Sequence, residues 1–234
     1  PATRKTSLRE FRVAVMLESP VCAQDDPLTQ QLHSALDRLR AAGANISEVA
    51  RPKLDFEHYH HVYLLLLRAA TGTILSESEF QDHLEGARLR SVSDHSYRAH
   101  IDRGVSLHYK QWWHLHNERE KFRIEWKRFF SDYDVLLCPV AASTAFPHDH
   151  SGERADRTIP INGQPEAVVD QLFWAGITTL ARLPSSVIPV GTAADNLPCG
   201  LQIITDYLED YTALEFAGLA EQTLGGFMPP SGFH

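Results

Sequence analysis

The stretch LPSSVIPVGTAADNLPCGLQIITD, residues 183–206, reads as two apolar strands joined by a polar turn. The strands are expected over about 185–192 and 199–206, because β-branched and apolar residues dominate both and prolines stand at their ends. The turn holds Ala194-Asp195-Asn196, and Gly200 allows another backbone to approach closely. The stretch therefore predicts a buried pair of sheet strands.

The first fifty residues predict an α/β unit. FRVAVML (11–17) is a compact apolar strand, and Asp26-Pro27 opens an amphipathic helix that Gly43 ends. NISEVARP (45–52) follows as a short strand. Strand, helix and strand in this order indicate a right-handed crossover between two parallel strands.

The middle of the chain is predicted to be helical. One helix runs from Asp55 to about Ala70, and Ser76 with Glu79 has the capping-box spacing that starts a second, which ends near Arg90. A polar loop (91–98) precedes a single long helix over about 99–132, which carries one apolar stripe. His108 and Arg119 fall within that stripe, and a buried arginine needs a partner.

The last hundred residues return to alternating strands and helices. The predicted elements are a strand VLLCPV ending at Pro139, a long loop over 141–165, a helix over about 166–175, a helix from Asp210 to Gly225-Gly226 and a surface tail. A loop of that length in a compact domain is usually functional or disordered. The whole chain, 1–234, is expected to form a single α/β domain with a mixed sheet flanked by helices.

Composition excludes several classes of protein. The net charge is −8 with no basic stripe, which argues against nucleic acid as a partner. There is no apolar run long enough for a membrane span and no signal peptide at residues 1–10, so we expect no membrane partner. The three widely spaced cysteines indicate a reducing compartment, and we expect a cytoplasmic protein.

The sequence has only weak motifs for metal binding, cofactor binding or nucleophilic catalysis. The thirteen histidines include the groups 58–61 and 148–150, but neither has clean metal-ligand spacing, so no metal is predicted. There is no phosphate loop and no dinucleotide fingerprint, so no cofactor is expected. Ser185 and Ser186 begin an apolar strand rather than a nucleophile elbow. Cys138 and Cys199 are expected to be buried as small apolar side chains.

Arg119 is the strongest candidate for a binding residue. As a structural residue, it would form an ion pair with an inward carboxylate such as Asp170 and so join the long helix to the helix at 166–175. As a functional residue, its planar guanidinium would hold a substrate carboxylate or carbonyl. Trp174 near Asp170 would line a pocket or belong to the core. The residues alone do not decide between a structural and a functional role for Arg119, or for Trp174.

Several segments in the same order resemble the C-terminal half of the amidase-signature hydrolases. These are YDVLLCPVAASTAFP (133–147), VVDQLFW (168–174), LPSSVIPVG (183–191), LPCGLQII (197–204) and EDYTALEFAGLAEQ (209–222). The resemblance implies a mixed sheet wrapped by helices. It also implies amide hydrolysis by a lysine, a bridging serine and a nucleophilic serine.

The family's Gly/Ser-rich catalytic run has no counterpart in these 234 residues, so no catalytic residue is assigned. The resemblance places Arg119 where some members hold substrate and Asp170 where they have an acidic partner; Trp174, near Asp170 in the sequence, is the third candidate substrate-binding residue. We therefore expect the C-terminal portion of an amidase, inactive alone. Its expected partners are the N-terminal half and a small-molecule amide, and the isolated chain should self-associate. A catalytically silent binding or assembly module is the alternative, and a His-dependent metallohydrolase is a third.

Overall fold

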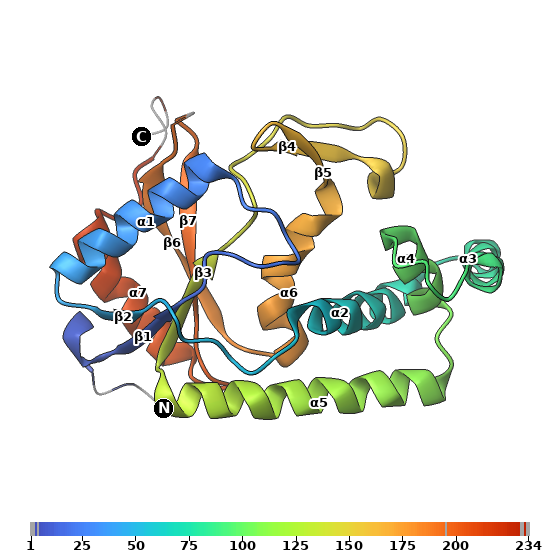
Figure 1. The fold of residues 1–234 in the computed structure, drawn as a ribbon, viewed down its shortest axis with the longest axis horizontal. Coiled ribbons are helices and arrows are strands. Elements are labelled where there is room, and N and C mark those ends of the chain that lie inside the picture. Colours follow the sequence, from blue (N-terminus) through green and yellow to red (C-terminus); the bar gives the residue numbers. More distant parts are fainter. Residues whose placement is uncertain (1–2, 4, 195, 230–231, 233–234) are drawn as a thin grey trace.

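A mixed sheet of five strands, in the order β2-β1-β3-β7-β6, forms the centre of the computed structural model, which describes residues 3, 5–194, 196–229 and 232. β1 is parallel to β2 and to β3, whereas β7 is antiparallel to both β3 and β6 (Figure 1). The strands are β1 (Arg12–Val15), β2 (Asn45–Ser47), β3 (Val135–Pro139), β6 (Ser185–Thr192) and β7 (Pro198–Ile204). The α/β class expected from the sequence is confirmed.

The strand pair predicted over 183–206 is present. β6 and β7 pair from Ser185 opposite Ile204 to Thr192 opposite Pro198, with an irregularity between Pro189 and Gly191. Gly200 is where another chain segment comes close, because a Cβ there would lie 2.9 Å from the Val187 side chain. Asp195, in the predicted turn, lies outside the described residues.

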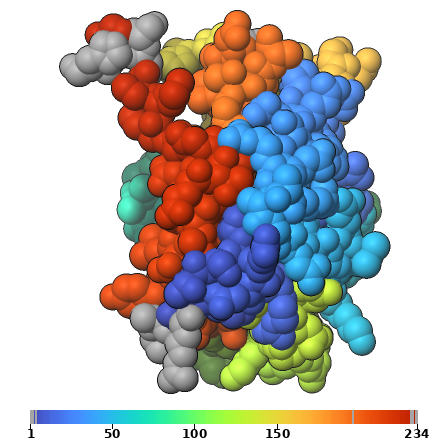
Figure 2. All heavy atoms as spheres, turned by 90° about the vertical axis from the view of Figure 1, so that its left-hand side faces the viewer, coloured from blue at the N-terminus to red at the C-terminus, as the bar shows by residue number. Residues whose placement is uncertain are grey.

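Helices cover both faces of the sheet. One face carries α1 (Asp26–Ala41) and α7 (Asp210–Leu224), which lie side by side in Figure 2. The other face carries α2 (Phe56–Thr71), α5 (Tyr109–Asp132) and α6 (Leu172–Ala181). Alternate residues of β1 enter the two cores: Val13 packs with the α1 side and Ala14 with the α2 side. A strand buried on both faces reads as a continuous apolar run, which is the pattern of FRVAVML.

Two short helices extend from this body (Figure 1). They are α3 (Glu77–Leu89) and α4 (Tyr97–Val105). The predicted capping box at the start of α3 is confirmed, since the Ser76 N–H donates to Glu79 Oε2 at 2.8 Å. No residue of α3 is buried, whereas α4 packs closely on α2. A Cβ on Gly104 would lie 2.9 Å from the Leu65 carbonyl oxygen. Among the described residues, no helix has the length and apolarity to cross a membrane.

The single helix predicted over 99–132 is wrong, because the chain breaks into α4 and α5 at residues 106–108. Polar side chains satisfy the backbone groups on both sides of the break. Ser106 Oγ donates to the Asp102 carbonyl at 2.7 Å, and the His108 N–H donates to Gln111 Oε1 at 3.0 Å. His108 is therefore the residue before α5 rather than part of an apolar stripe.

The loop predicted over 141–165 extends only to residue 157, with one 3₁₀ turn at Arg154–Asp156, and the loop and helix predicted from there to residue 171 are wrong. A two-stranded hairpin, β4 (Thr158–Ile161) and β5 (Gln164–Ala167), occupies this region. Its turn is Asn162-Gly163, both with positive φ, which is the residue pair preferred in two-residue hairpins. The hairpin takes up residues 164–167, so α6 starts only at Leu172, after a 3₁₀ turn over Val168–Gln171.

A buried hydrogen-bond relay ties α5, α2 and α6 together. Trp126 Nε1 on α5 donates to the Tyr59 hydroxyl on α2 at 3.2 Å, and that hydroxyl donates to the Ile177 carbonyl on α6 at 2.7 Å. Trp126 is 0% exposed and Tyr59 1%. Burial raises the pKa of Tyr59, so the hydroxyl keeps its proton. The relay fixes the position of α6 over the sheet.

We predict that Tyr59→Phe lowers the free energy of unfolding by about 1–3 kcal/mol, because the Trp126 N–H loses its buried acceptor. Urea unfolding at neutral pH measures the loss. Tyr211→Phe, which removes a hydroxyl from a side chain of a residue that is 63% exposed, is the matched control and should change stability little. Equal stability of the two variants would show that the relay contributes nothing.

Candidate functional site

The carboxyl ends of β1 and β3 open at the same edge of the sheet, because the two strands are parallel neighbours. The segments that leave them lie together: the Asp25 N–H donates to the Ala142 carbonyl at 2.8 Å. In open α/β sheets, ligands bind outside the carboxyl ends of the strands. This edge is therefore the candidate site.

Two glutamines hold the backbone at this edge. Gln24 Nε2 donates to the Ala141 carbonyl at 3.1 Å, and Gln24 Oε1 accepts from Trp174 Nε1 at 3.0 Å. Gln171 Oε1 accepts from the Ala142 N–H at 2.8 Å, and its Nε2 donates to Ser143 Oγ at 3.3 Å. The segment 141–143 is thereby fixed from both sides.

Asp170 brings a partly buried carboxylate to the site. Burial raises its pKa to about 6, and the nearby Glu166 carboxylate acts in the same direction. Among the described residues, Asp170 has no ion pair with a cationic side chain. At neutral pH it is therefore largely ionised and able to accept a hydrogen bond from an N–H group.

Cys22 lies near Asp170 but is not poised as a nucleophile. It is 2% exposed, and burial raises the pKa of its thiol to about 12, with Asp170 and Glu166 adding to the effect. Only the thiolate is a strong nucleophile, so Cys22 is inert at neutral pH. Its Sγ lies 3.6 Å from the carbonyl oxygen of Ala23.

Trp174 belongs to the core. It has no exposed surface, and its ring packs edge-to-face on Phe173 with centroids 4.9 Å apart. Its indole N–H donates to Gln24 Oε1, which connects it to the candidate site. Direct contact between Trp174 and a substrate stays a prediction.

Arg119 is not brought to Asp170. It lies beside Arg182, which follows α6, whereas Asp170 precedes α6, and that ten-residue helix is about 15 Å long. Its Nη2 lies 2.6 Å from His116 Nδ1, and its Nε lies 3.9 Å from Glu120 Oε1. The structural ion pair with Asp170 is therefore wrong, and a substrate contact of Arg119 stays a prediction.

The remaining candidates take ordinary roles. Cys138 and Cys199 are buried, as expected, and Cys138 Sγ lies 3.2 Å from Gln202 Nε2. Within the described part of the chain, no three His, Cys, Asp or Glu side chains are grouped to hold a metal ion. Ser185 and Ser186 lie on β6 at the edge of the sheet.

Sequence reasoning missed Gln24, Gln171 and Cys22. Gln24 follows the first predicted strand, and the rule that ligands bind beyond the carboxyl ends of strands marks that position. Gln171 directly follows Asp170. Neither glutamine belongs to a recognisable motif, since each acts through backbone groups far away in the sequence.

Comparisons with known proteins agree on one family. The family model described as Amidase matches residues 1–214. A glutamyl-tRNA(Gln) amidotransferase subunit from Maricaulis maris (strain MCS10) is 24% identical over 240 residues, which cover 96% of this chain and 46% of that protein.

The solved structures agree with the fold. A crystal structure of an amidase has a TM-score of 0.71 and 24% identity, covering 96% of this chain and 48% of its own. A bacterial aryl acylamidase of the amidase-signature family has a TM-score of 0.67 and 18% identity, and the match covers 93% of this chain and 44% of the acylamidase chain. The chain thus spans about half the length of the relatives it matches.

We predict that Asp170→Asn changes how stability depends on pH. The pKa of Asp170 in the folded chain, about 6, is above its value of 3.8 in the unfolded chain. Between these values the folded state holds the proton more tightly, so wild-type stability falls as pH rises. Well above pH 6, Asp170 is ionised in both the folded and the unfolded chain, so the loss of wild-type stability is complete. Relative to Asp170→Asn, the wild type should therefore lose stability between pH 4 and pH 7.

Chemical denaturation across that pH range measures this difference. Glu166→Gln is the companion variant: it removes the neighbouring negative charge, so the pKa of Asp170 should move toward 3.8 and the wild-type loss should shrink. A constant difference between wild type and Asp170→Asn from pH 4 to pH 7 would contradict the raised pKa.

Proposed function

The chain belongs to the amidase family, and from that premise we propose that it forms one wall of an active site that hydrolyses the carbon–nitrogen bond of an amide. The wall is the edge at the carboxyl ends of β1 and β3. In this proposal the reactive serines and the lysine stand on polypeptide outside the 234 residues. The small-molecule amide lies between the two parts.

Asp170 carries the proposal. A partly buried carboxylate with no cationic partner among the described residues is an acceptor for the N–H groups of an amide or for a substrate ammonium. The fixed segment 141–143 and the two glutamines give that acceptor a rigid surrounding. Such preorganised polar groups orient a substrate at no further cost when it binds.

The residues at this edge support binding rather than bond cleavage. Cys22 is protonated, and the Ser143 hydroxyl donates to the Thr144 carbonyl at 3.0 Å, so its proton is directed at a backbone acceptor rather than a base. The proposed chemistry is that of the resembled hydrolases. A serine oxygen attacks the amide carbon, the amine leaves with a proton relayed from the lysine, and water then cleaves the acyl ester.

We predict that a fluorophosphonate probe, which reacts with activated serines, labels the complete gene product on a serine outside these 234 residues. The isolated chain should remain unlabelled and should not hydrolyse para-nitroacetanilide. Peptide mapping by mass spectrometry locates the label. Labelling of a serine within the chain, or hydrolysis by the chain alone, would refute the proposal that the reactive serines lie outside these 234 residues.

In the complete gene product, Asp170→Asn should lower kcat/KM for the amide by about tenfold or more, since the variant loses a charged acceptor. Asp37→Asn is the matched control, because the Asp37 side chain is 75% exposed on α1, where it pairs with Arg40. A complete gene product that binds amides without hydrolysing them would favour the alternative, a catalytically silent binding module.

We also propose that β6 is a surface for association. It is an edge strand of the described sheet, so one row of its backbone groups has no strand partner there. Val187 on this strand is 53% exposed. An exposed sheet edge with an apolar side chain invites pairing with another chain, which supports the expected self-association of the isolated chain.

We predict that Val187→Lys reduces that self-association, because a lysine on an edge strand opposes strand pairing. Sedimentation velocity over a range of concentrations measures the average mass. Val49→Lys introduces the same charge at a residue that is 90% exposed outside β6 and should leave the mass unchanged. A wild-type chain that is monomeric at every concentration would contradict the proposal.

A further inference from the structure

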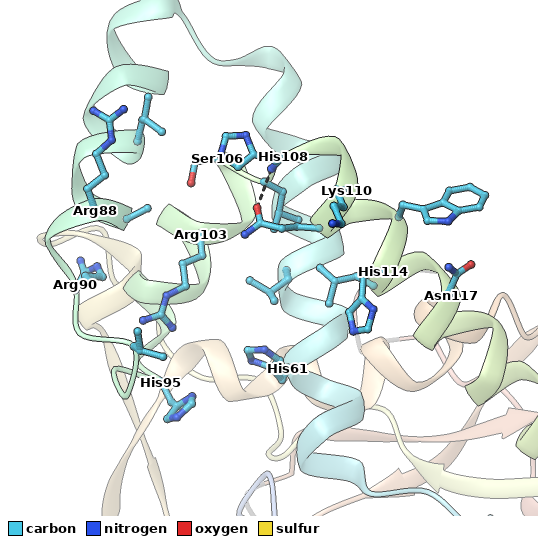
Figure 3. Close-up of a pocket in the computed structure, with 18 residues that line it drawn as sticks. His61, Arg88, Arg90, His95, Arg103, Ser106, His108, Lys110, His114 and Asn117 are labelled. Carbon is cyan, nitrogen blue, oxygen red and sulfur yellow. Dashed lines mark hydrogen bonds between the residues drawn. The ribbon is translucent and has the colours of Figure 1, made fainter.

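A large cavity lies between α2, α3, α4 and α5, away from the edge that holds Asp170. Its volume is about 1320 Å³, above the range of about 300–1,000 Å³ that is usual for small-molecule sites. Figure 3 shows its lining side chains. His60 and His61 are neighbours on α2 but face different sides: His60 packs on Phe173 of α6, whereas His61 lines the cavity.

The walls of the cavity are mainly apolar. Helix α2 contributes Leu65, α3 contributes Leu84, and the joint between α4 and α5 contributes Leu107. Trp113 of α5 adds an aromatic side chain, and its residue is 49% exposed. An exposed apolar concavity of this kind is typical of a ligand site.

The charged side chains that line the cavity are all basic. They are Arg88, Arg90, Arg103 and Lys110, whereas no aspartate or glutamate of the described residues lines it. The chain as a whole has 30 acidic and 22 basic residues, so this local excess runs against the net charge of −8. A cationic ligand is therefore disfavoured.

Arg103 differs from Arg90 in having no carboxylate partner within the part of the chain that the structure describes. Arg90 is neutralised by Asp102 at 2.5 Å and Asp94 at 3.0 Å. The Arg103 guanidinium instead donates to the carbonyls of Asp94 at 2.7 Å and Ser91 at 2.6 Å. Two of its five N–H groups are used, and the remaining donors and the full positive charge stay available.

His61 limits how much negative charge the cavity takes. His100 Nδ1 lies 2.9 Å from the Ser96 carbonyl, so it carries the proton, and its Nε2 accepts from His61 Nδ1 at 2.8 Å. His61 Nε2 is then a bare acceptor. The pKa of His61 is lowered to about 4 by burial first, and then by the neighbouring His100 and by basic side chains including Arg103, so His61 stays neutral. A neutral His61 therefore adds no positive charge beside Arg103.

We propose that this cavity binds an organic monocarboxylate with an apolar body. The carboxylate pairs with Arg103, which in Figure 3 extends from α4 toward His95, with His61 beside it. The apolar body lies against Leu65, Leu84 and Leu107. The Arg103 guanidinium, which has no carboxylate partner among the described residues, presents planar N–H donors that match a carboxylate, and the apolar walls match the apolar body.

The test is a titration of the purified chain with 4-phenylbutyrate, monitored by calorimetry and by backbone amide NMR shifts. Saturable binding is expected, with shifted amides in residues 84–95 and 103–117. The neutral analogue 4-phenylbutanol should bind about tenfold more weakly or worse, because it lacks the charge that Arg103 pairs with. Acetate, which lacks the apolar body, should bind more weakly still.

Arg103→Gln should weaken 4-phenylbutyrate binding about tenfold or more. Arg128→Gln is the matched control, because Arg128 lies on α5 outside the cavity and pairs with Glu125. If Arg103→Gln does not fold, the wild-type NMR map and the comparison with 4-phenylbutanol decide. No saturation up to about 10 mM, shifts elsewhere, or equal binding of the alcohol would overturn the proposal.

Discussion

The relay from Trp126 through Tyr59 to the Ile177 carbonyl is the constraint on which the arrangement of helices depends. A buried hydroxyl or indole N–H without a partner is costly, so α5, α2 and α6 have one favourable relative position. Gly176 strengthens this constraint, because a Cβ there would lie 2.6 Å from the Tyr63 ring. The position of α6 in turn places Asp170 and Gln171, which directly precede it, at the carboxyl ends of β1 and β3.

Helix α2 separates two regions of opposite character. On its α6 side lies the edge with Asp170 and Glu166, where negative charge gathers. On its other side lies the cavity with Arg103, whose charge no carboxylate of the described residues neutralises. The two proposals therefore ask for different ligands: an N–H donor at the first region and an anion at the second. The distinction rests on which carboxylates and guanidiniums have partners, and not on the net charge.

The elements with strong local signals could be predicted from the sequence. Apolar runs and end prolines located β6 and β7, and caps located α3. The break at residues 106–108 was missed because the apolar spacing continues across it, while the polar contacts of Ser106 and Gln111 end one helix and begin the next. The dipeptide Asn162-Gly163 is typical of a hairpin turn, but it was not recognised because the residues around it are mostly polar. At the site, Asp170 was identified through a family resemblance. The supporting glutamines act on distant backbone groups and leave no local pattern.

Helix α3 has no buried residue, and this sets where the fold is weakest. Its formation depends on its capping box and on contacts with α4, so little apolar surface is exposed when it opens. Opening it therefore requires only a fraction of the free energy of global unfolding. Protease cleavage and amide hydrogen exchange should begin there while the sheet remains intact. Because α3 forms one wall of the cavity, a bound molecule would slow both processes.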